Sequence, residues 1–150
     1  MILGIVGAEE RSWIQLEKLK AREFILNFIT EVKPDYITSG HCPLGGVDLW
    51  AEEFAKLLNI PTKIFPPEVN GWSDWNGKKG YKTRNLEIAK ASDILLVVSP
   101  ILNNKVVRNG GEWTGEQASK MPGKTVKWIR VSEIGQIKID TTISNDIFQF

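Results

Sequence analysis

The sequence predicts a single α/β domain built on a mostly parallel sheet, and three observations support this prediction. Five short apolar runs are separated by segments with helical periodicity. Most of these runs end at glycine, serine or proline, as strands do where they enter a loop. The composition, with 42% hydrophobic and 25% charged residues in 150, suits one globular domain. Alternating strands and helices form βαβ units, so we expect three layers, with five strands and helices on both faces.

The first part of the chain is predicted to form a strand, a helix and a second strand. Residues 2–6 are an apolar run that ends at Gly7, as expected of a buried parallel strand. Residues 14–32 predict a helix, because their apolar residues recur every three or four positions and form one stripe. Pro34 ends this helix, and residues 36–40 then predict the second strand.

The middle of the chain adds two helices and two strands. Residues 47–58 have a clear helical period, with apolar side chains on one face and acids on the others. Residues 62–65 predict a third strand, which Pro66 prevents from continuing. A helix over residues 80–91 is followed by the most apolar run of the sequence, residues 93–99, which predicts a buried fourth strand.

The last part completes the expected sheet. Residues 101–111 are polar and predict a loop, residues 112–121 a short helix, and residues 125–131 the fifth strand. The domain core therefore spans about residues 1–131. Residues 132–150 form a C-terminal extension that either adds an edge strand or lies across the body of the domain.

Charge and cysteine content exclude several classes of protein. Lys and Arg total 19 and Asp and Glu total 18, so a net charge of +1 argues against a broad electrostatic grip on DNA or on an anionic membrane. The single cysteine, Cys42, has no partner for an internal disulfide. The apolar start, residues 1–7, is too short for a signal peptide, and no apolar run approaches a membrane span. We expect a cytoplasmic protein without a membrane partner, and the charge disfavours nucleic acid as a partner.

A glycine-rich loop follows the second strand and leads into a helix. In a parallel sheet the ligand crevice lies beyond the carboxyl ends of the strands, so the loops after Gly7 and Ser39 are candidate binding loops. Gly40, Gly45 and Gly46 lie just before a helix N-terminus, where free backbone N–H groups and the helix dipole favour a phosphate. The loop matches no established phosphate-binding fingerprint, so alone it is weak evidence.

The polar residues around this loop can be explained without a role in binding a ligand or a metal. Asp48 lies in the first turn of the helix, where an acid stabilises the helix dipole. His41 is the only histidine and Cys42 lies beside it, without the second group of ligands that a metal site needs. We therefore predict no metal and no resident cofactor.

Arg84 and Asn85 begin the helix that precedes the fourth strand. An exposed arginine here commonly forms a surface ion pair, and Glu87 is a candidate partner. However, this helix begins on the side of the expected crevice, and arginine is the preferred bidentate partner of phosphate. We therefore favour a ligand-binding role for Arg84 and Asn85.

A second glycine-rich segment follows the fourth strand and also enters a helix. Gly110 and Gly111 offer backbone N–H groups to a phosphate or ribose, and Thr114 offers a hydroxyl. Glu112 and Glu116 are candidates for the ribose hydroxyls, although acids at the start of a helix also occur for dipole reasons alone. Two such loops at one crevice support a binding site more strongly than either loop does alone.

Six tryptophans divide into two predicted groups. Trp50 and Trp128 fit core positions. The other four lie in or next to predicted loops, where an aromatic ring can stack on a nucleobase, although we expect at least one of them to cover the core: Trp13, Trp72, Trp75 and Trp113. Of these, Trp72 is our candidate for ligand contact.

The order of these signals resembles the SLOG superfamily, a Rossmann-like group that includes the DprA/Smf DNA-processing proteins and the lonely-guy phosphoribohydrolases. The similarity is greatest to small stand-alone, YspA-like members and covers about residues 2–130. The segments that carry it are Ile37-Thr38-Ser39-Gly40, Gly46-Val47-Asp48, Ile64-Phe65-Pro66-Pro67, Gly80-Tyr81-Lys82-Thr83-Arg84-Asn85 and Ala91-Ser92-Asp93. The resemblance implies a Rossmann-like domain with a nucleotide pocket that includes Asp48.

The resemblance to the phosphoribohydrolases is partial. Arg84 matches their arginine, which makes Arg84 a candidate catalytic residue together with an acid in the second glycine-rich segment. That segment departs from their Pro-Gly-Gly-x-Gly-Thr-x-x-Glu loop: Asn109 replaces the proline, Trp113 the third glycine, and Gln117 stands where the glutamate is expected. Glu116 comes one residue early, and one residue turns a helical side chain by about 100°.

Three functions follow as hypotheses. The first is a module that binds a nucleotide or nucleotide-derived molecule, as a sensor or by sequestering it. The second is a nucleoside 5′-monophosphate N-glycosidase, with Arg84 on the phosphate and Glu116 or Glu112 as the acid. The third, a single-stranded DNA-binding module, is favoured by the loop tryptophans and opposed by the near-neutral charge. By analogy with related folds we also expect a homodimer or larger homo-oligomer.

Overall fold

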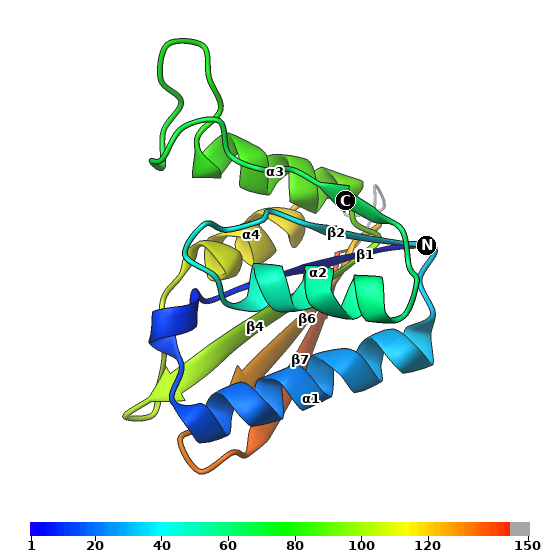
Figure 1. Ribbon diagram of the computed structural model, residues 1–150, viewed down its shortest axis with the longest axis vertical. Coiled ribbons are helices and arrows are strands. Elements are labelled where there is room, and N and C mark those ends of the chain that lie inside the picture. Colours follow the sequence, from blue (N-terminus) through cyan, green and yellow to red (C-terminus); the bar gives the residue numbers. More distant parts are fainter. Residues whose placement is uncertain (145–150) are drawn as a thin grey trace, which may run out of the picture.

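Six strands form the central sheet of the computed structural model, which describes residues 1–144 (Figure 1). Their order across the sheet is β3-β2-β1-β4-β6-β7, and a short β5 pairs with the end of β4. The first five strands in this order are parallel, and β7 is antiparallel to β6. The strands are β1 (Ile2–Gly7), β2 (Tyr36–Ser39), β3 (Thr62–Ile64), β4 (Ile94–Leu102), β5 (Lys105–Val106), β6 (Thr125–Val131) and β7 (Ile137–Ile143). The predicted α/β fold is confirmed.

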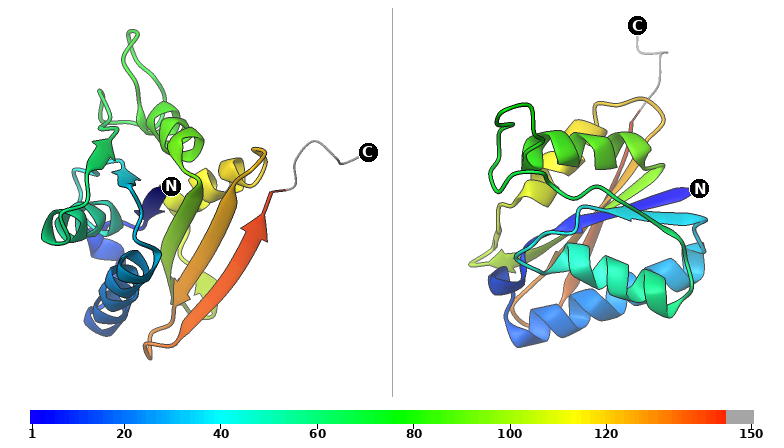
Figure 2. Two further views of the ribbon diagram at one scale, coloured as in Figure 1. Left: turned by 90° about the vertical axis from the view of Figure 1, so that its right-hand side faces the viewer. Right: turned by 45° about the horizontal axis from the view of Figure 1, so that its top comes forward.

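Four helices cover the two faces of the sheet (Figure 2). The helices are α1 (Gln15–Val32), α2 (Val47–Leu57), α3 (Tyr81–Ala91) and α4 (Gly110–Ala118). Helices α1 and α2 pack in one hydrophobic cluster, and α3 and α4 pack in the cluster on the opposite face. Neighbouring residues of β4 alternate between these clusters: Leu96 belongs to the first and Leu95 to the second. A strand that is buried on both faces has no solvent-facing side, so its residues do not alternate between apolar and polar. This explains the continuous apolar run of β4.

The segment after β4 differs from the predicted loop. Strand β4 continues to Leu102 and turns through Asn103 and Asn104, both with positive φ, into β5. Helix α4 then begins at Gly110, two residues earlier than predicted, because the Asn109 side chain caps it by accepting a hydrogen bond from the Glu112 N–H. The second glycine-rich segment therefore forms the first turn of the helix.

Two alternatives left open by the sequence are decided by the structure. The C-terminal extension adds the edge strand β7. Trp13, which we placed among the loop tryptophans, is one that covers the core: it is 8% exposed and its ring lies 5.3 Å from that of Trp50. Within residues 1–144, no helix combines the length and apolarity needed to cross a bilayer.

Candidate functional site

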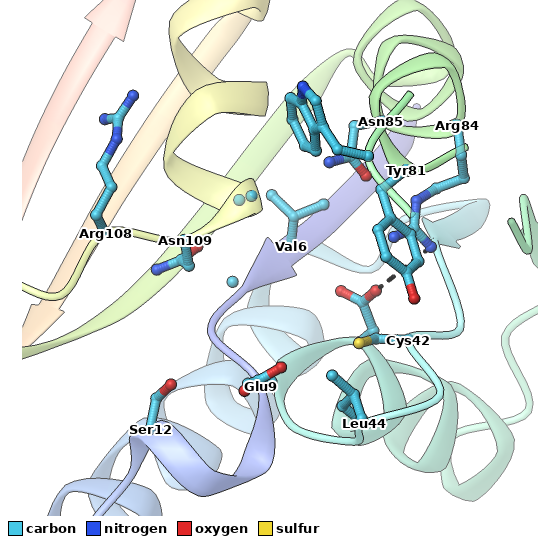
Figure 3. A pocket seen from close by; sticks show the side chains of 15 residues that line it. Val6, Glu9, Ser12, Cys42, Leu44, Tyr81, Arg84, Asn85, Arg108 and Asn109 are labelled. Atoms are coloured by element: carbon cyan, nitrogen blue, oxygen red, sulfur yellow. Dashed lines mark ion pairs between the residues drawn. The ribbon is translucent and has the colours of Figure 1, made fainter. Parts of the chain in front are cut away.

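A cavity of about 300 Å³ lies at the carboxyl end of β1, between the first turns of α2, α3 and α4 (Figure 3). The strand order reverses here, because β2 and β3 extend the sheet on one side of β1 and β4 lies on the other. Such a switch point is where open α/β sheets bind ligands. The lining residues are Val6, Gly7, Glu9, Ser12, Cys42, Leu44, Asp48, Trp72, Tyr81, Arg84, Asn85, Arg108, Asn109, Gly110 and Gly111.

Arg84 is the buried cation of this cavity. Its side chain is only 6% exposed and donates a hydrogen bond from Nη1 to the carbonyl oxygen of Gly40. Its Nε is buried without a hydrogen-bond partner among the described residues. A Cβ atom on Gly40 would lie 2.6 Å from the guanidinium carbon, so only glycine leaves room for this arrangement. Gly40 therefore positions Arg84 at the cavity.

Asp48 lies beside this cation, with 3.9 Å between its Oδ2 and Nη1 of Arg84. Burial raises the pKa of Asp48 to about 6, against the opposing effects of the Arg84 charge and of the Cys42 backbone N–H. Asp48 thus exchanges a proton close to neutral pH, and its carboxyl group faces the cavity as well as lying in the first turn of α2. A perturbed acid beside a cation in a cleft is typical of a functional site.

The N-terminus of α4 forms the opposite wall of the cavity. The backbone N–H groups of Gly110 and Gly111 have no acceptor in the part of the chain that the structure describes. A Cβ atom on Gly111 would lie 2.6 Å from the backbone nitrogen of Gly7, so this glycine lets the helix start directly against the end of β1. Free N–H groups at a helix N-terminus favour an anion.

Asn85 faces the same helix terminus. The residue is 6% exposed, and its side chain lines the cavity. Its Nδ2 lies 3.2 Å from the position that a Cβ atom of Gly110 would take, and Figure 3 shows the amide directed toward α4. A side-chain amide has both donors and an acceptor, so at the lining of a cavity it can form hydrogen bonds with a polar ligand. Asn85 therefore adds a polar group to the cavity at the start of α4.

Aromatic side chains form the outer wall of the cavity. Trp72 is 41% exposed, and its ring meets the ring of Trp113 edge to face, with the two centroids 4.9 Å apart. Tyr81, one helical turn before Arg84, presents its ring to the cavity (Figure 3). Trp75 is 68% exposed beside the turn at residues 76–77 and does not line the cavity. Trp72 and Tyr81 are therefore the rings available to a flat ligand.

Some of the predicted site residues build the surroundings of the cavity instead of its lining. The Ser39 hydroxyl donates to the carbonyl oxygen of Asp48, and the Thr114 hydroxyl donates to that of Gly110. Gly45 and Gly46 have positive φ and shape the loop, and a Cβ atom on Gly46 would lie 2.6 Å from the carbonyl carbon of Glu9. Their expected contact with ligand stays a prediction.

Glu116 also lies outside the lining. Its carboxylate pairs at 2.5 Å with Arg108, an exposed residue at the rim of the cavity whose side chain runs along α4 (Figure 3). This pair lowers the pKa of Glu116 through the Arg108 hydrogen bond. The structure thus brings together Arg84, Asn85 and the first turn of α4 but leaves Glu116 apart from them.

Glu112 does not line the cavity but stabilises the first turn of α4, which does. Its buried carboxylate accepts hydrogen bonds from Ser99, at 2.8 Å, and from Arg130, at 2.5 Å. Asn109 donates to the same Ser99 hydroxyl at 2.9 Å while it caps α4. Glu112, Ser99, Asn109 and Arg130 therefore form one connected network that fixes the start of α4.

We expect the substitution Glu112→Gln to destabilise the fold by about 2 kcal/mol, because it leaves the mostly buried Arg130 with only the more distant carboxylate of Asp140, at 3.9 Å. Urea denaturation measures this change. The matched control is Glu53→Gln, which removes the acid of the surface pair with Arg22 and should cost about 0.5 kcal/mol or less. Equal effects of the two substitutions would contradict the supporting role of the network.

Several lining residues were not predicted from the sequence. Glu9 and Ser12 follow β1, and Leu44 lies in the first glycine-rich loop. Tyr81 had a readable signal, because it lies three positions before Arg84 and so shares its helix face. Asn109 also had one, since asparagine before two glycines is a favoured helix cap.

The fold is known from another protein. No family model and no curated protein matches the chain. Among solved structures, it is similar to the X-ray structure of DNA processing protein A (DprA) from Streptococcus pneumoniae, with a TM-score of 0.54 and 16% sequence identity over 83% of this chain and 49% of that chain. The chain thus has a DprA-like Rossmann fold and spans about half the length of that structure. Membership of the YspA-like group stays a prediction.

Proposed function

We propose that this protein binds a nucleotide or a nucleotide-derived small molecule in the cavity at the end of β1. The observation that carries the proposal is that three kinds of donor line one cavity: the Arg84 guanidinium, the Asn85 amide and the first N–H groups of α4. Together they offer a positive charge and hydrogen bonds to one anionic group. A phosphate is the ligand group that best matches such donors.

The rest of the cavity supports the proposal by its shape. A phosphate at Gly110 and Gly111 leaves the base to lie against Trp72 or Tyr81, whose rings can stack on it. Asp48, in the first turn of α2, also lines the cavity and is a candidate acceptor for ribose hydroxyls. A volume of about 300 Å³ is at the small end of ligand pockets, which favours a ligand of mononucleotide size.

Titration calorimetry tests this function. The panel contains AMP, ADP-ribose, NAD and cyclic nucleotides, with adenosine as the control that lacks the phosphate. The proposal predicts that at least one phosphorylated member binds and that adenosine binds much more weakly. Absence of binding by every phosphorylated member would overturn it.

Hydrolysis of an N-glycosidic bond is a second candidate function, and the state of Asp48 favours it. An acid whose pKa is raised to about 6 inside the cavity is suited to assist a water molecule that attacks the ribose as the base departs. Chromatography of AMP incubated with the protein detects release of the base. Abolition of this release by Asp48→Asn supports Asp48 as the acid.

We expect Glu116→Gln to leave nucleotide affinity, and any base release, within about threefold of the parent protein, because Glu116 does not line the cavity and its pair with Arg108 is exposed to solvent. The same calorimetric and chromatographic assays measure both quantities. Loss of base release in this variant, with nucleotide binding intact, would instead restore Glu116 as the catalytic acid.

Single-stranded DNA remains the third hypothesis. The DprA protein is described as a DNA processing protein, which says nothing direct about a chain with 16% identity to it. The exposed ring of Trp75 offers a surface on which a base can stack. The net charge of +1, however, provides little attraction for the phosphate backbone of single-stranded DNA. A gel shift with a short oligonucleotide at low salt distinguishes this function from binding of a free nucleotide.

A further inference from the structure

The two edges of the sheet are different. Strand β3 has three residues and lies between Pro61 and Pro66, so little of it can pair with another chain. Strand β7 has seven residues, and in the described part of the chain it pairs only with β6. Figure 2 shows β7 at the edge of the sheet with no helix or strand beyond it. A long open edge is a site for pairing with another strand.

The side chains of β7 alternate between an apolar face and a charged face. Ile139 and Ile143 point to the side of the sheet that α1 covers, yet they are 51% and 69% exposed. Lys138 and Asp140 lie on the opposite side, where Lys138 is directly across from Arg130 in β6. Among residues 1–144 Lys138 forms no ion pair, and Asp140 reaches only Arg130, at 3.9 Å. Both faces thus contain groups that a neighbouring strand can satisfy.

We propose that β7 pairs with β7 of a second copy of this chain, antiparallel and about a two-fold axis at Ile139. In this register Lys138 of each copy lies opposite Asp140 of the other, and the two Ile139 side chains face each other. A register centred on Lys138 or on Asp140 instead places like charges opposite each other, which is unfavourable. Charge complementarity therefore selects one register and a second copy as the partner.

The pairing joins the two sheets into one continuous sheet through their β7 edges. The two ion pairs then lie on the side of the sheet that carries Arg130, and Ile139 becomes covered on the other side. The cavity at the end of β1 contains no residue of β7, so the pairing leaves it open. The proposal is independent of what the cavity binds.

Sedimentation velocity over a hundredfold range of protein concentration tests the pairing. The parent chain is expected to form a dimer reversibly. Lys138→Asp and Asp140→Lys each place like charges opposite each other across the axis, so each variant alone should be at least tenfold weaker in dimerisation. An equimolar mixture of the two variants restores opposite charges at both positions and should form a heterodimer. Circular dichroism of each variant checks that it is folded.

The heterodimer is the result that a general effect on folding cannot produce, because each variant is defective alone. A parent chain that stays monomeric at every concentration would overturn the proposal. A dimer unaffected by both substitutions would also overturn it. If a chain ending at Ser144 becomes monomeric while both charge variants stay dimeric, the contact runs through residues 145–150 and β7 pairing is wrong.

Discussion

Arg84→Ala is expected to weaken nucleotide binding by at least about a hundredfold, because loss of one partner of a buried charge pair costs about 2–5 kcal/mol. The guanidinium is the one positive group that we place on the phosphate, and it is 6% exposed, so bulk water screens it little. Titration calorimetry with the best ligand of the panel measures the loss. Urea denaturation measures separately how far the substitution affects folding.

The conservative variant Arg84→Lys distinguishes charge from geometry. Lysine keeps the positive charge but lacks the planar fork that contacts two phosphate oxygens, so we expect a loss of about tenfold. Near-parent affinity of Arg84→Ala in a folded protein would show that the phosphate binds elsewhere.

Gly40→Ala is expected to produce a similar loss without touching the ligand. The added Cβ would lie 2.6 Å from the guanidinium carbon of Arg84, so the side chain has to leave its position against the Gly40 carbonyl. We expect affinity to fall by about thirtyfold or more, which corresponds to about 2 kcal/mol of binding free energy. The backbone itself has no positive φ at this residue, so the effect comes from crowding.

Gly71→Ala is the matched control for this substitution. No heavy atom lies within 4 Å of the position that its Cβ would occupy, and its φ is also not positive. We expect parent affinity and a change in folding stability below about 0.5 kcal/mol. If the Gly40→Ala variant had the same nucleotide affinity as the Gly71→Ala variant, Gly40 would not position Arg84.

The sequence was sufficient to predict the fold and the presence of Arg84 and the start of α4 around one cavity. Strand runs buried on both faces are readable from composition, and parallel strands place the loops at their carboxyl ends on one edge of the sheet. That rule brought Arg84, Gly110 and Gly111 to one cavity without knowledge of any side-chain conformation.

The roles of individual glycines and acids were not readable in this way. Gly40 and Gly46 look equivalent to Gly110 in a sequence, yet they make room for Arg84 and for the chain after β1 instead of lining the cavity. Glu112 and Glu116 are four positions apart, but Glu112 is buried in an ion pair with Arg130, while the Glu116 side chain is exposed to solvent. These differences depend on which partner lies opposite each residue, and that is set by tertiary packing.

An NMR titration with AMP tests most directly whether a phosphate binds at the start of α4 beside Arg84. The backbone amide resonances of Gly110 and Gly111 and the side-chain amide of Asn85 are predicted to shift most, and phosphate alone should shift the same resonances at higher concentration. Binding of AMP that leaves these three signals in place and shifts resonances on another face of the domain would contradict the proposed site.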